Sequence, residues 1–283
     1  MSGIAIVTDS ACDMPVALQR EFGITTIPLT VRFGMQECLD CDLALEDFWV
    51  RALQSPPYPG TSQPSVGQFE QEYARHVEQG KHVICLTVTS KHSGTYNSAG
   101  TAAQQFPGQV TVFDTHSLSL AQGYMAIRAA EAAARGENVE QVMRLLESLR
   151  ERTKFFVMLD TIEFLRRGGR ADRIMPVLEK IVRMLSIKPI LHFVDGELAA
   201  LGAARSRDKA TQRILQEIVK LAPAEKLIVL HTRAPDAAAS LAAAIATEVG
   251  YPMDQVMIGE AGPVLSCHAG PGVLAAAIVQ VRA

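Results

Sequence analysis

The chain has 283 residues, of which 48% are hydrophobic and 20% are charged, and its formal net charge at pH 7 is −3. The hydrophobic content is sufficient for a full core, and the slightly negative net charge does not indicate a nucleic-acid-binding protein. The length is typical of two domains. The amino terminus lacks the basic segment of a secretory signal, and no uncharged apolar run reaches the roughly 18 residues of a membrane span. The five cysteines, an odd number, indicate reduced thiols, so we expect a cytoplasmic protein.

The first half of the chain alternates short apolar runs with helical patterns. Strands are predicted at GIAIVTDS, TTIPLTVRF, HVICLTVTS and QVTVFDT. Helices are predicted at VALQREFG, LEDFWVRALQ, SVGQFEQEYARHVEQG, SGTYNSAGTAAQQF, LSLAQGYMAIRAAEAAARG and VEQVMRLLESLRER. Ser65 and Gln68 form a capping-box pattern, and the prolines of SPPYPGTSQP predict a loop without regular structure. The alternation of strands and helices predicts a parallel sheet.

The pattern changes near Lys154. Strands are predicted at KFFVML, IKPILHFVDGEL, LAALGAAR and KLIVLHT, with a hairpin turn at DGE, and QVMIGE is a further element of unassigned type. Helices are predicted over residues 174–185, at KATQRILQEIVKL and PDAAASLAAAIATEVG, and at the carboxyl-terminal run VLAAAIVQVR. We therefore expect a two-domain α/β protein, with a parallel-sheet domain over residues 1–153 and an α/β domain with a mixed sheet over residues 154–283.

Hydroxyl side chains follow the ends of the predicted parallel strands. They occur at residues 8–10, 87–93 and 114–117, and the proline-rich loop adds Thr61, Ser62 and Ser65. The carboxyl ends of parallel strands share one edge of the sheet, where ligands bind, so these loops are expected to meet. Helix capping explains each single hydroxyl better than ligand contact does, whereas for the whole set the two explanations are equally good.

Several kinds of site have no support in the sequence. The chain lacks GxxxxGK[ST], GxGxxG, GxSxG and HExxH, and Cys38 and Cys41 form a single CxxC without the second pair of a structural zinc site. His92 directly precedes Ser93, and on a helix neighbouring residues point about 100° apart, which makes His92 a poor base for that serine. His268 is a base for Ser93 only if the two ends of the chain meet. An esterase or thioesterase using Ser93 and His268 stays open as the alternative function.

The segment LDTIEFLRRGGRADR surrounds a Gly-Gly turn with Arg166, Arg167, Arg170 and Arg173. One interpretation is a solvated basic loop, and the other is a docking site for an acidic or phosphate-bearing partner. The sequence favours neither.

Eight motifs occur in order along the chain: IVTDSACDMP, TSQPSVGQFEQEY, LTVTSKHSGTYNSA, VFDTHSLSLAQGY, LDTIEFLRRGGR, SIKPIL, ARSRDKA and SCHAGPG. Together they resemble the DegV family over nearly the whole chain. The resemblance implies two α/β domains with a long-chain fatty acid, such as palmitate, buried between or beneath them. It implies that Thr61 and Ser93 in the first domain hold the carboxylate, that His268 lies near the head group, and that the second domain covers the acyl chain.

The resemblance also implies a binding protein with a role in fatty acid transport or metabolism and not an enzyme on its own, with no metal and no cofactor besides the bound fatty acid. Some members of the family are the binding subunit of a bacterial fatty acid kinase, and in that setting Arg170 is implied as a partner contact. The motifs do not say whether this chain has a kinase partner.

Overall fold

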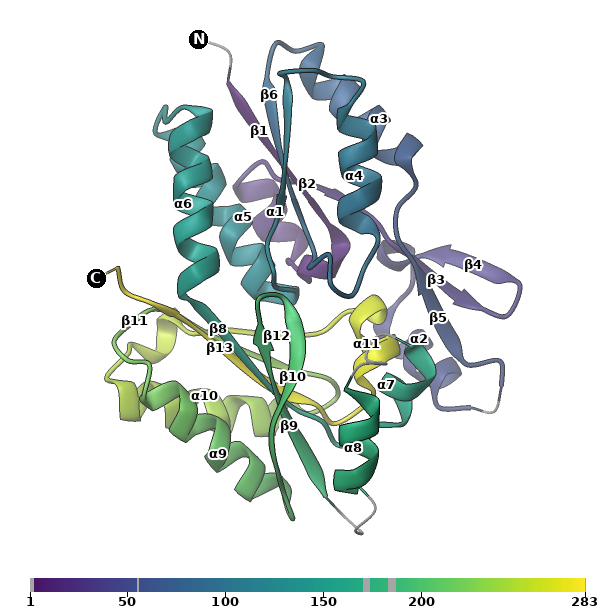
Figure 1. The fold of residues 1–283 in the computed structure, drawn as a ribbon, viewed down its shortest axis with the longest axis vertical. Helices are drawn as coiled ribbons and strands as arrows, with labels where there is room; N and C mark the ends of the chain where they lie inside the picture. The colour runs from purple at the N-terminus through teal and green to yellow at the C-terminus, as the bar shows by residue number, and fades with distance from the viewer. Residues whose placement is uncertain (1–2, 55, 170–173, 183–186, 283) are drawn as a thin grey trace. The chain divides into compact units, whose positions relative to one another are not determined.

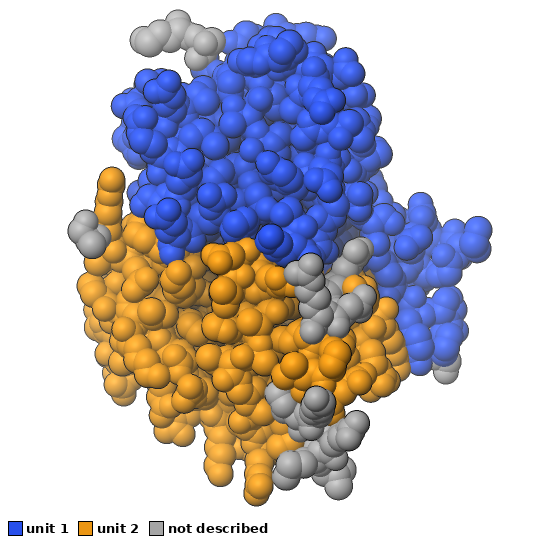
Figure 2. All heavy atoms as spheres, in the orientation of Figure 1, with its two compact units in different colours: residues 1–151, 262–264 blue, residues 152–261, 265–283 orange. Residues whose placement is uncertain are grey.

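The computed structural model describes residues 3–54, 56–169, 174–182 and 187–282 (Figure 1). Its contacts divide the chain into two compact units, coloured separately in Figure 2. Unit 1 comprises Met1–Glu151 and Gly262–Val264, and unit 2 comprises Arg152–Ala261 and Leu265–Ala283. Unit 1 thus includes three residues from near the carboxyl terminus, whereas the expected domains were continuous segments.

The main sheet of unit 1 is parallel, as the alternating pattern predicted. Its strand order is β2-β1-β6-β7, and every neighbouring pair is parallel. The strands are β1 (Ile4–Asp9), β2 (Thr25–Ile27), β6 (His82–Thr87) and β7 (Val110–Asp114). In the two central strands, β1 and β6, every residue after the first is buried. Burial on both faces explains their continuous apolar sequences.

Helices cover both faces of this sheet (Figure 1). The helices of unit 1 are α1 (Val16–Glu21), α2 (Leu45–Ala52), α3 (Val66–Val77), α4 (Thr95–Ala103), α5 (Ser119–Ala134) and α6 (Val139–Arg152), of which α2 packs against the small sheet described below through Phe48 and Phe33. The helices α3 and α4 pack on one face through Phe69, Tyr73 and Ala99, and α5 lies on the other side. The predicted capping box of α3 is present: the backbone N–H of Ser65 donates to Gln68 Oε1 (2.9 Å), and the N–H of Gln68 donates to Ser65 Oγ (3.3 Å).

A second small sheet in unit 1 corrects two sequence predictions. It has the order β4-β3-β5 and consists of β3 (Thr30–Phe33), β4 (Gln36–Leu39) and β5 (Pro59–Ser62). TTIPLTVRF was predicted as one strand, but β2 ends before Pro28 and β3 belongs to the other sheet, because proline cannot donate to a ladder. The proline-rich loop was predicted to lack regular structure, yet it contains β5. Pro59 is tolerated there because it begins an edge strand.

Unit 2 contains a mixed sheet, as predicted. Its order is β10-β9-β8-β13-β11-β12, and only β11 and β12 pair in parallel. The strands are β8 (Thr153–Met158), β9 (Lys188–Val194), β10 (Glu197–Ala204), β11 (Ala224–His231), β12 (Met257–Glu260) and β13 (Leu274–Gln280). The predicted hairpin is β9–β10, and its turn residues Asp195 and Gly196 have φ of 49° and 80°. Positive φ at both positions is what a tight hairpin turn requires.

The helices of unit 2 are α7 (Glu163–Gly168), α8 (Met175–Val182), α9 (Arg207–Val219), α10 (Pro235–Val249) and α11 (Pro263–Ala269), of which α11 begins in unit 1. One face of the sheet packs against α9 and α10 through Ile214 and Leu241, and a separate cluster around Leu178 and Leu191 includes residues of α7 and α8.

The carboxyl-terminal run was predicted as a helix, and this prediction was wrong. Residues Leu274–Gln280 form β13, which lies between β8 and β11 and is buried at every position but the last. An unbroken apolar run shows no period that separates a strand from a buried helix. The two neighbouring strands decide the outcome, and they are distant in sequence.

Candidate functional site

The loops after β1 and β6 are joined by the carboxylate of Asp9. Asp9 is fully buried and accepts hydrogen bonds from the backbone N–H groups of Ala11 (3.0 Å) and Val88 (2.7 Å). Burial raises the pKa of Asp9 to about 6, while the donors from Val88, Gln122 and Ala11 oppose the rise. Asp9 therefore has a structural role at the edge of the sheet.

The loops after β6 and β7 are also tied together. The hydroxyl of Thr115 donates to the carbonyl oxygen of Thr87 (2.8 Å), and the N–H of Thr89 donates to the carbonyl of Ser117 (2.9 Å). The N–H of Ser90 donates to the Asp114 carboxylate at 3.2 Å. The structure thus gathers three of the predicted hydroxyl-rich loops at one edge of the parallel sheet, as expected.

Ser93 lies in the turn before α4, where it is half-buried. Its hydroxyl oxygen accepts from the N–H of Thr95 (3.2 Å) and lies 2.8 Å from the Thr95 hydroxyl. This is a local serine turn, whereas the N-cap of α4 is Gly94, so no side chain caps this helix. Both interactions join Ser93 to Thr95, and neither involves the neighbouring His92. A serine hydroxyl has one proton and two acceptor positions, and when Thr95 donates, the Ser93 proton is available to an anionic ligand.

Thr61 lies in β5 and is 9% exposed. The chain continues through Gln63 to the capping box of α3. A Cβ atom placed on Gly94 would lie 2.8 Å from the amide carbon of Gln63, so the Gln63 side chain rests directly on the Gly94 backbone. Glycine at position 94 therefore lets the loop after Thr61 approach the turn that carries Ser93. The sequence analysis did not predict this contact. The glycine directly after Ser93 is the sequence signal that could have indicated it.

His268 lies on α11 in unit 2, where it is half-buried. A Cβ atom on Gly168, the last residue of α7, would collide with Nδ1 of His268. A Cβ atom on Gly270, whose φ is 75°, would lie 2.8 Å from the ring of Phe164. The motifs LRRGG and CHAGPG therefore pack directly against each other, and their glycines make this packing possible.

An ionic cluster supports the Gly-Pro-Gly loop after His268. Arg207 donates to the carbonyl of Gly272 (3.3 Å) and to Asp160 Oδ1 (3.2 Å), and Lys188 lies 2.8 Å from the same oxygen. Burial alone raises the pKa of Asp160, but the hydrogen bonds and charges of Lys188 and Arg207 outweigh it and hold that pKa below its usual value. These residues, which were not among the predicted site residues, fix the loop.

The remaining predicted features are distributed as follows. Arg170, the expected partner contact, lies outside the described residues. Arg166, on α7, is paired with Glu163 at 2.6 Å. Among the described residues, no group of three His, Cys, Asp or Glu side chains could hold a metal ion, and no helix is long and apolar enough to cross a membrane.

The family assignment follows from comparison with known proteins. The family model described as "Uncharacterised protein, DegV family" matches residues 3–281 of the chain. The chain belongs to the DegV family. A DegV domain-containing protein of Streptomyces coelicolor is 33% identical over 283 residues, and one of Listeria monocytogenes is 31% identical over 277 residues. In both comparisons the alignment covers 96% of each chain.

Solved structures share this fold over nearly the whole chain. The structure of a DegV family protein from Thermus thermophilus, described for its fatty acid binding, is 33% identical with a TM-score of 0.90 and covers 98% of this chain and 99% of that one. A Thermotoga maritima protein described as revealing a fatty acid binding function is 27% identical with a TM-score of 0.86, over 99% and 100% of the two chains. A stearic-acid-binding protein from Eubacterium ventriosum is 26% identical with a TM-score of 0.87, over 99% and 98%.

Proposed function

We propose that this DegV protein is a carrier of long-chain fatty acids such as palmitate and is not an enzyme on its own. The observation that carries the proposal is its similarity, over nearly the whole chain, to solved structures described as binding fatty acids. The hydroxyl-rich edge of the parallel sheet supports it, since the contact between Gln63 and Gly94 brings the Thr61 loop next to the Ser93 turn.

The proposed head-group site uses uncharged donors. Thr61 and Ser93 donate to the carboxylate, His268 is a third contact, residues 1–153 supply the carboxylate loops, and residues 154–283 cover the acyl chain. Burying a chain of about sixteen carbons gains roughly 0.8 kcal/mol per CH₂, or about 12 kcal/mol before the costs of binding. The contacts to the head group therefore need only to orient the ligand. Neutral donors can do this, and they bind the carboxylate less tightly than an arginine would.

The esterase alternative has less support. It requires a base at Ser93, and within unit 1 the Ser93 hydroxyl bonds to Thr95 and not to the neighbouring His92. The similar solved structures are described as binding fatty acids. We also propose, on the motifs alone, that the protein acts in the cytoplasm in fatty acid transport or metabolism and presents its ligand to a fatty acid kinase, with Arg170 as a contact. Formation of acyl phosphate by such a kinase, measured with wild-type protein and with Arg170→Ala, tests this role.

The central experiment is native mass spectrometry of the purified protein followed by lipid extraction. We expect the intact mass to exceed that of the polypeptide by one fatty acid, and the extract to contain that acid. Protein that carries no fatty acid and binds none added in excess would refute the carrier function.

Variants of the two hydroxyls test the proposed head-group site. Ser93→Ala and Thr61→Val each remove one hydrogen bond to the carboxylate, so we expect fatty acid affinity to fall by roughly 0.5–1.5 kcal/mol, or about 2- to 10-fold. Thr101→Val is the control, because Thr101 is an exposed hydroxyl on α4 that donates to the Asn97 carbonyl. Turnover of acyl esters that disappears in Ser93→Ala, with ligand binding intact, would establish the esterase instead.

A further inference from the structure

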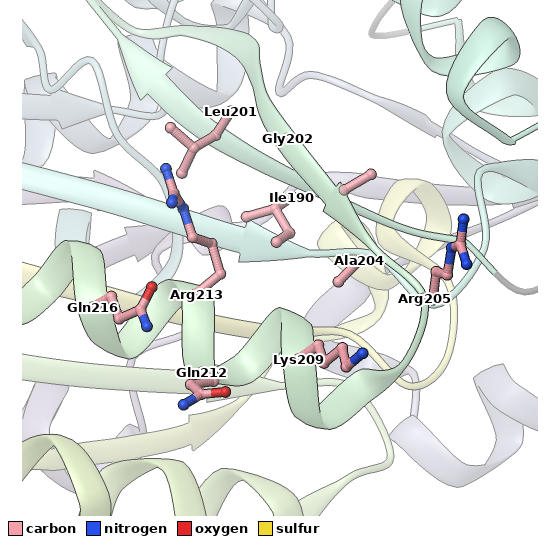
Figure 3. Close-up of a pocket in the computed structure, with 10 residues that line it drawn as sticks. Ile190, Leu201, Gly202, Ala204, Arg205, Lys209, Gln212, Arg213 and Gln216 are labelled. Carbon is pink, nitrogen blue, oxygen red and sulfur yellow. The ribbon is translucent and has the colours of Figure 1, made fainter.

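A groove of about 520 Å³ lies in unit 2 between α9 and the edge strand β10 (Figure 3). Its floor includes Ile190, Leu201 and Ala204, and its rim includes Arg205, Lys209 and Arg213. The described residues that line it include three cations and no acidic side chain. None of the residues proposed to bind the fatty acid carboxylate belongs to this groove.

Two of the three cations are not neutralised. Arg213 pairs with Glu217 at 2.9 Å. Arg205 and Lys209 are exposed, and within the described part of the chain neither has an acidic partner. Figure 3 shows Arg205 and Lys209 towards one end of the groove and the Arg213 guanidinium near Leu201 towards the other. The free positive charge that lines the groove is therefore concentrated where α9 begins, and the exposed Asp208 in the same turn does not line it.

The position of Lys209 opposes the electrostatics of its own helix. Ser206 is the N-cap of α9, and its hydroxyl accepts from the N–H of Lys209 (3.3 Å), which makes Lys209 the third helical residue. A glutamate or glutamine at that position completes a capping box, whereas a cation there opposes the helix dipole. The same chain has the favourable arrangement in α3, where Ser65 is followed by Gln68.

Arg207, the first residue of α9, does not add to the unpaired positive charge of Arg205 and Lys209. It is already bonded to Asp160 (3.2 Å) and to the Gly272 carbonyl. Residues that break a local rule without a compensating contact are expected at functional sites. The contact missing at Arg205 and Lys209 is an anion, which a helix N-terminus also attracts.

We propose that this groove binds a small phosphorylated organic molecule, with its phosphate at Arg205 and Lys209 and its apolar part along Ile190, Leu201 and Ala204. A guanidinium, an ammonium and a helix N-terminus together suit a phosphate dianion. The apolar floor selects an organic phosphate over a bare ion, and the cavity volume lies in the range of small-molecule sites. The proposal does not depend on fatty acid binding.

The test is a calorimetric titration of the full-length protein with 1-naphthyl phosphate, with inorganic phosphate and 1-naphthol as reference ligands. We expect saturable binding of 1-naphthyl phosphate that is at least about tenfold tighter than binding of either reference, because only this probe uses both the cations and the floor. Amide NMR shifts on titration should fall on α9 and β10.

The Lys209→Glu variant tests whether Lys209 binds the phosphate or only supports the structure of α9. We expect its affinity for 1-naphthyl phosphate to fall by about tenfold or more, while its thermal midpoint stays the same or rises, because glutamate completes the capping box with Ser206. Lys220→Glu, which changes the same charge in the residue that follows the other end of α9, is the matched control and should bind like wild type. Absence of saturable binding, equal affinity in Lys209→Glu and wild type, or inorganic phosphate binding as tightly as the aryl phosphate would each overturn the proposal.

Discussion

At the scale of single residues, polar side chains with similar sequence contexts have different environments. Asp9 is the last residue of the parallel strand β1, Ser93 lies in the loop after the parallel strand β6, and a helical turn follows each of them. Asp9 is completely buried and receives backbone donors from two loops, whereas Ser93 is half-buried and bonds only within its own turn in unit 1. The first arrangement holds the fold together, and the second leaves hydrogen-bonding capacity for a ligand.

The buried carboxyl of Asp9 predicts a pH dependence of stability. Its pKa rises from 3.8 to about 6 on folding, so the folded state binds this proton more tightly than the unfolded chain does. The resulting stabilisation is fully present below about pH 4 and is lost as the pH rises through 6, a change on the order of 3 kcal/mol. Urea unfolding of wild type and Asp9→Asn at pH 4 to 7 measures it. Parallel curves for the two proteins would contradict the prediction.

Gly168 predicts a steric effect on unit 2. In Gly168→Ala the new methyl group would collide with the His268 ring, so we expect a loss of about 1–3 kcal/mol in the free energy of unfolding. Gly100→Ala is the control, because Gly100 lies within α4 and a Cβ there meets nothing within 4 Å. That substitution should stabilise the protein by roughly 0.5–1 kcal/mol. Equal effects of the two substitutions in denaturant unfolding would show that the contact with His268 is unimportant.

At the scale of secondary structure, short-range signals determined where many elements begin and turn. The capping box at Ser65 and the Asp-Gly turn of β9–β10 need only a few consecutive residues, and both form as predicted. The strands β5 and β13 were mispredicted because their identity depends on partners elsewhere in the chain. Pro59 pairs with Phe33 across a sheet, and Leu274 pairs with Met158.

The capping box gives a prediction for one helix. Ser65→Ala removes the acceptor for the N–H of Gln68, so we expect a loss of about 1 kcal/mol in the free energy of unfolding. Ser240→Ala is a suitable control, because Ser240 is an exposed residue within α10 that only donates back to the Asp236 carbonyl. Chemical denaturation compares the two variants, and an equal loss in both would argue against a specific role of the cap.

At the scale of the whole molecule, unit 1 depends on residues from the far end of the sequence. The carboxylate of Asp13 accepts from the hydroxyl of Ser119 (2.5 Å) and from the N–H of Gly262 (2.9 Å). Burial raises the pKa of Asp13 to about 7. The segment Gly262–Val264 thus belongs to unit 1 although the chain around it belongs to unit 2.

Ligand removal gives a prediction for the molecule as a whole. If the protein carries a fatty acid, delipidation should lower its unfolding midpoint, and added palmitate should restore it. At a free concentration of 100 Kd the stabilisation is about 2.7 kcal/mol. Methyl palmitate is the control, because it keeps the tail and lacks the carboxylate. Differential scanning calorimetry measures these shifts, and an unchanged midpoint on delipidation and reloading would count against the proposed carrier function.

The sequence by itself determined what depends on neighbouring residues or on a simple period: the parallel strands β1 and β6, the cap at Ser65, and the gathering of hydroxyls after strand ends. The tertiary structure alone decided which distant segments touch. It placed Gln63 on Gly94, His268 on Gly168, and Arg207 on the Gly272 carbonyl. These contacts join residues far apart along the chain, where no local pattern records the pairing, and they need the folded backbone to bring the partners within bonding distance.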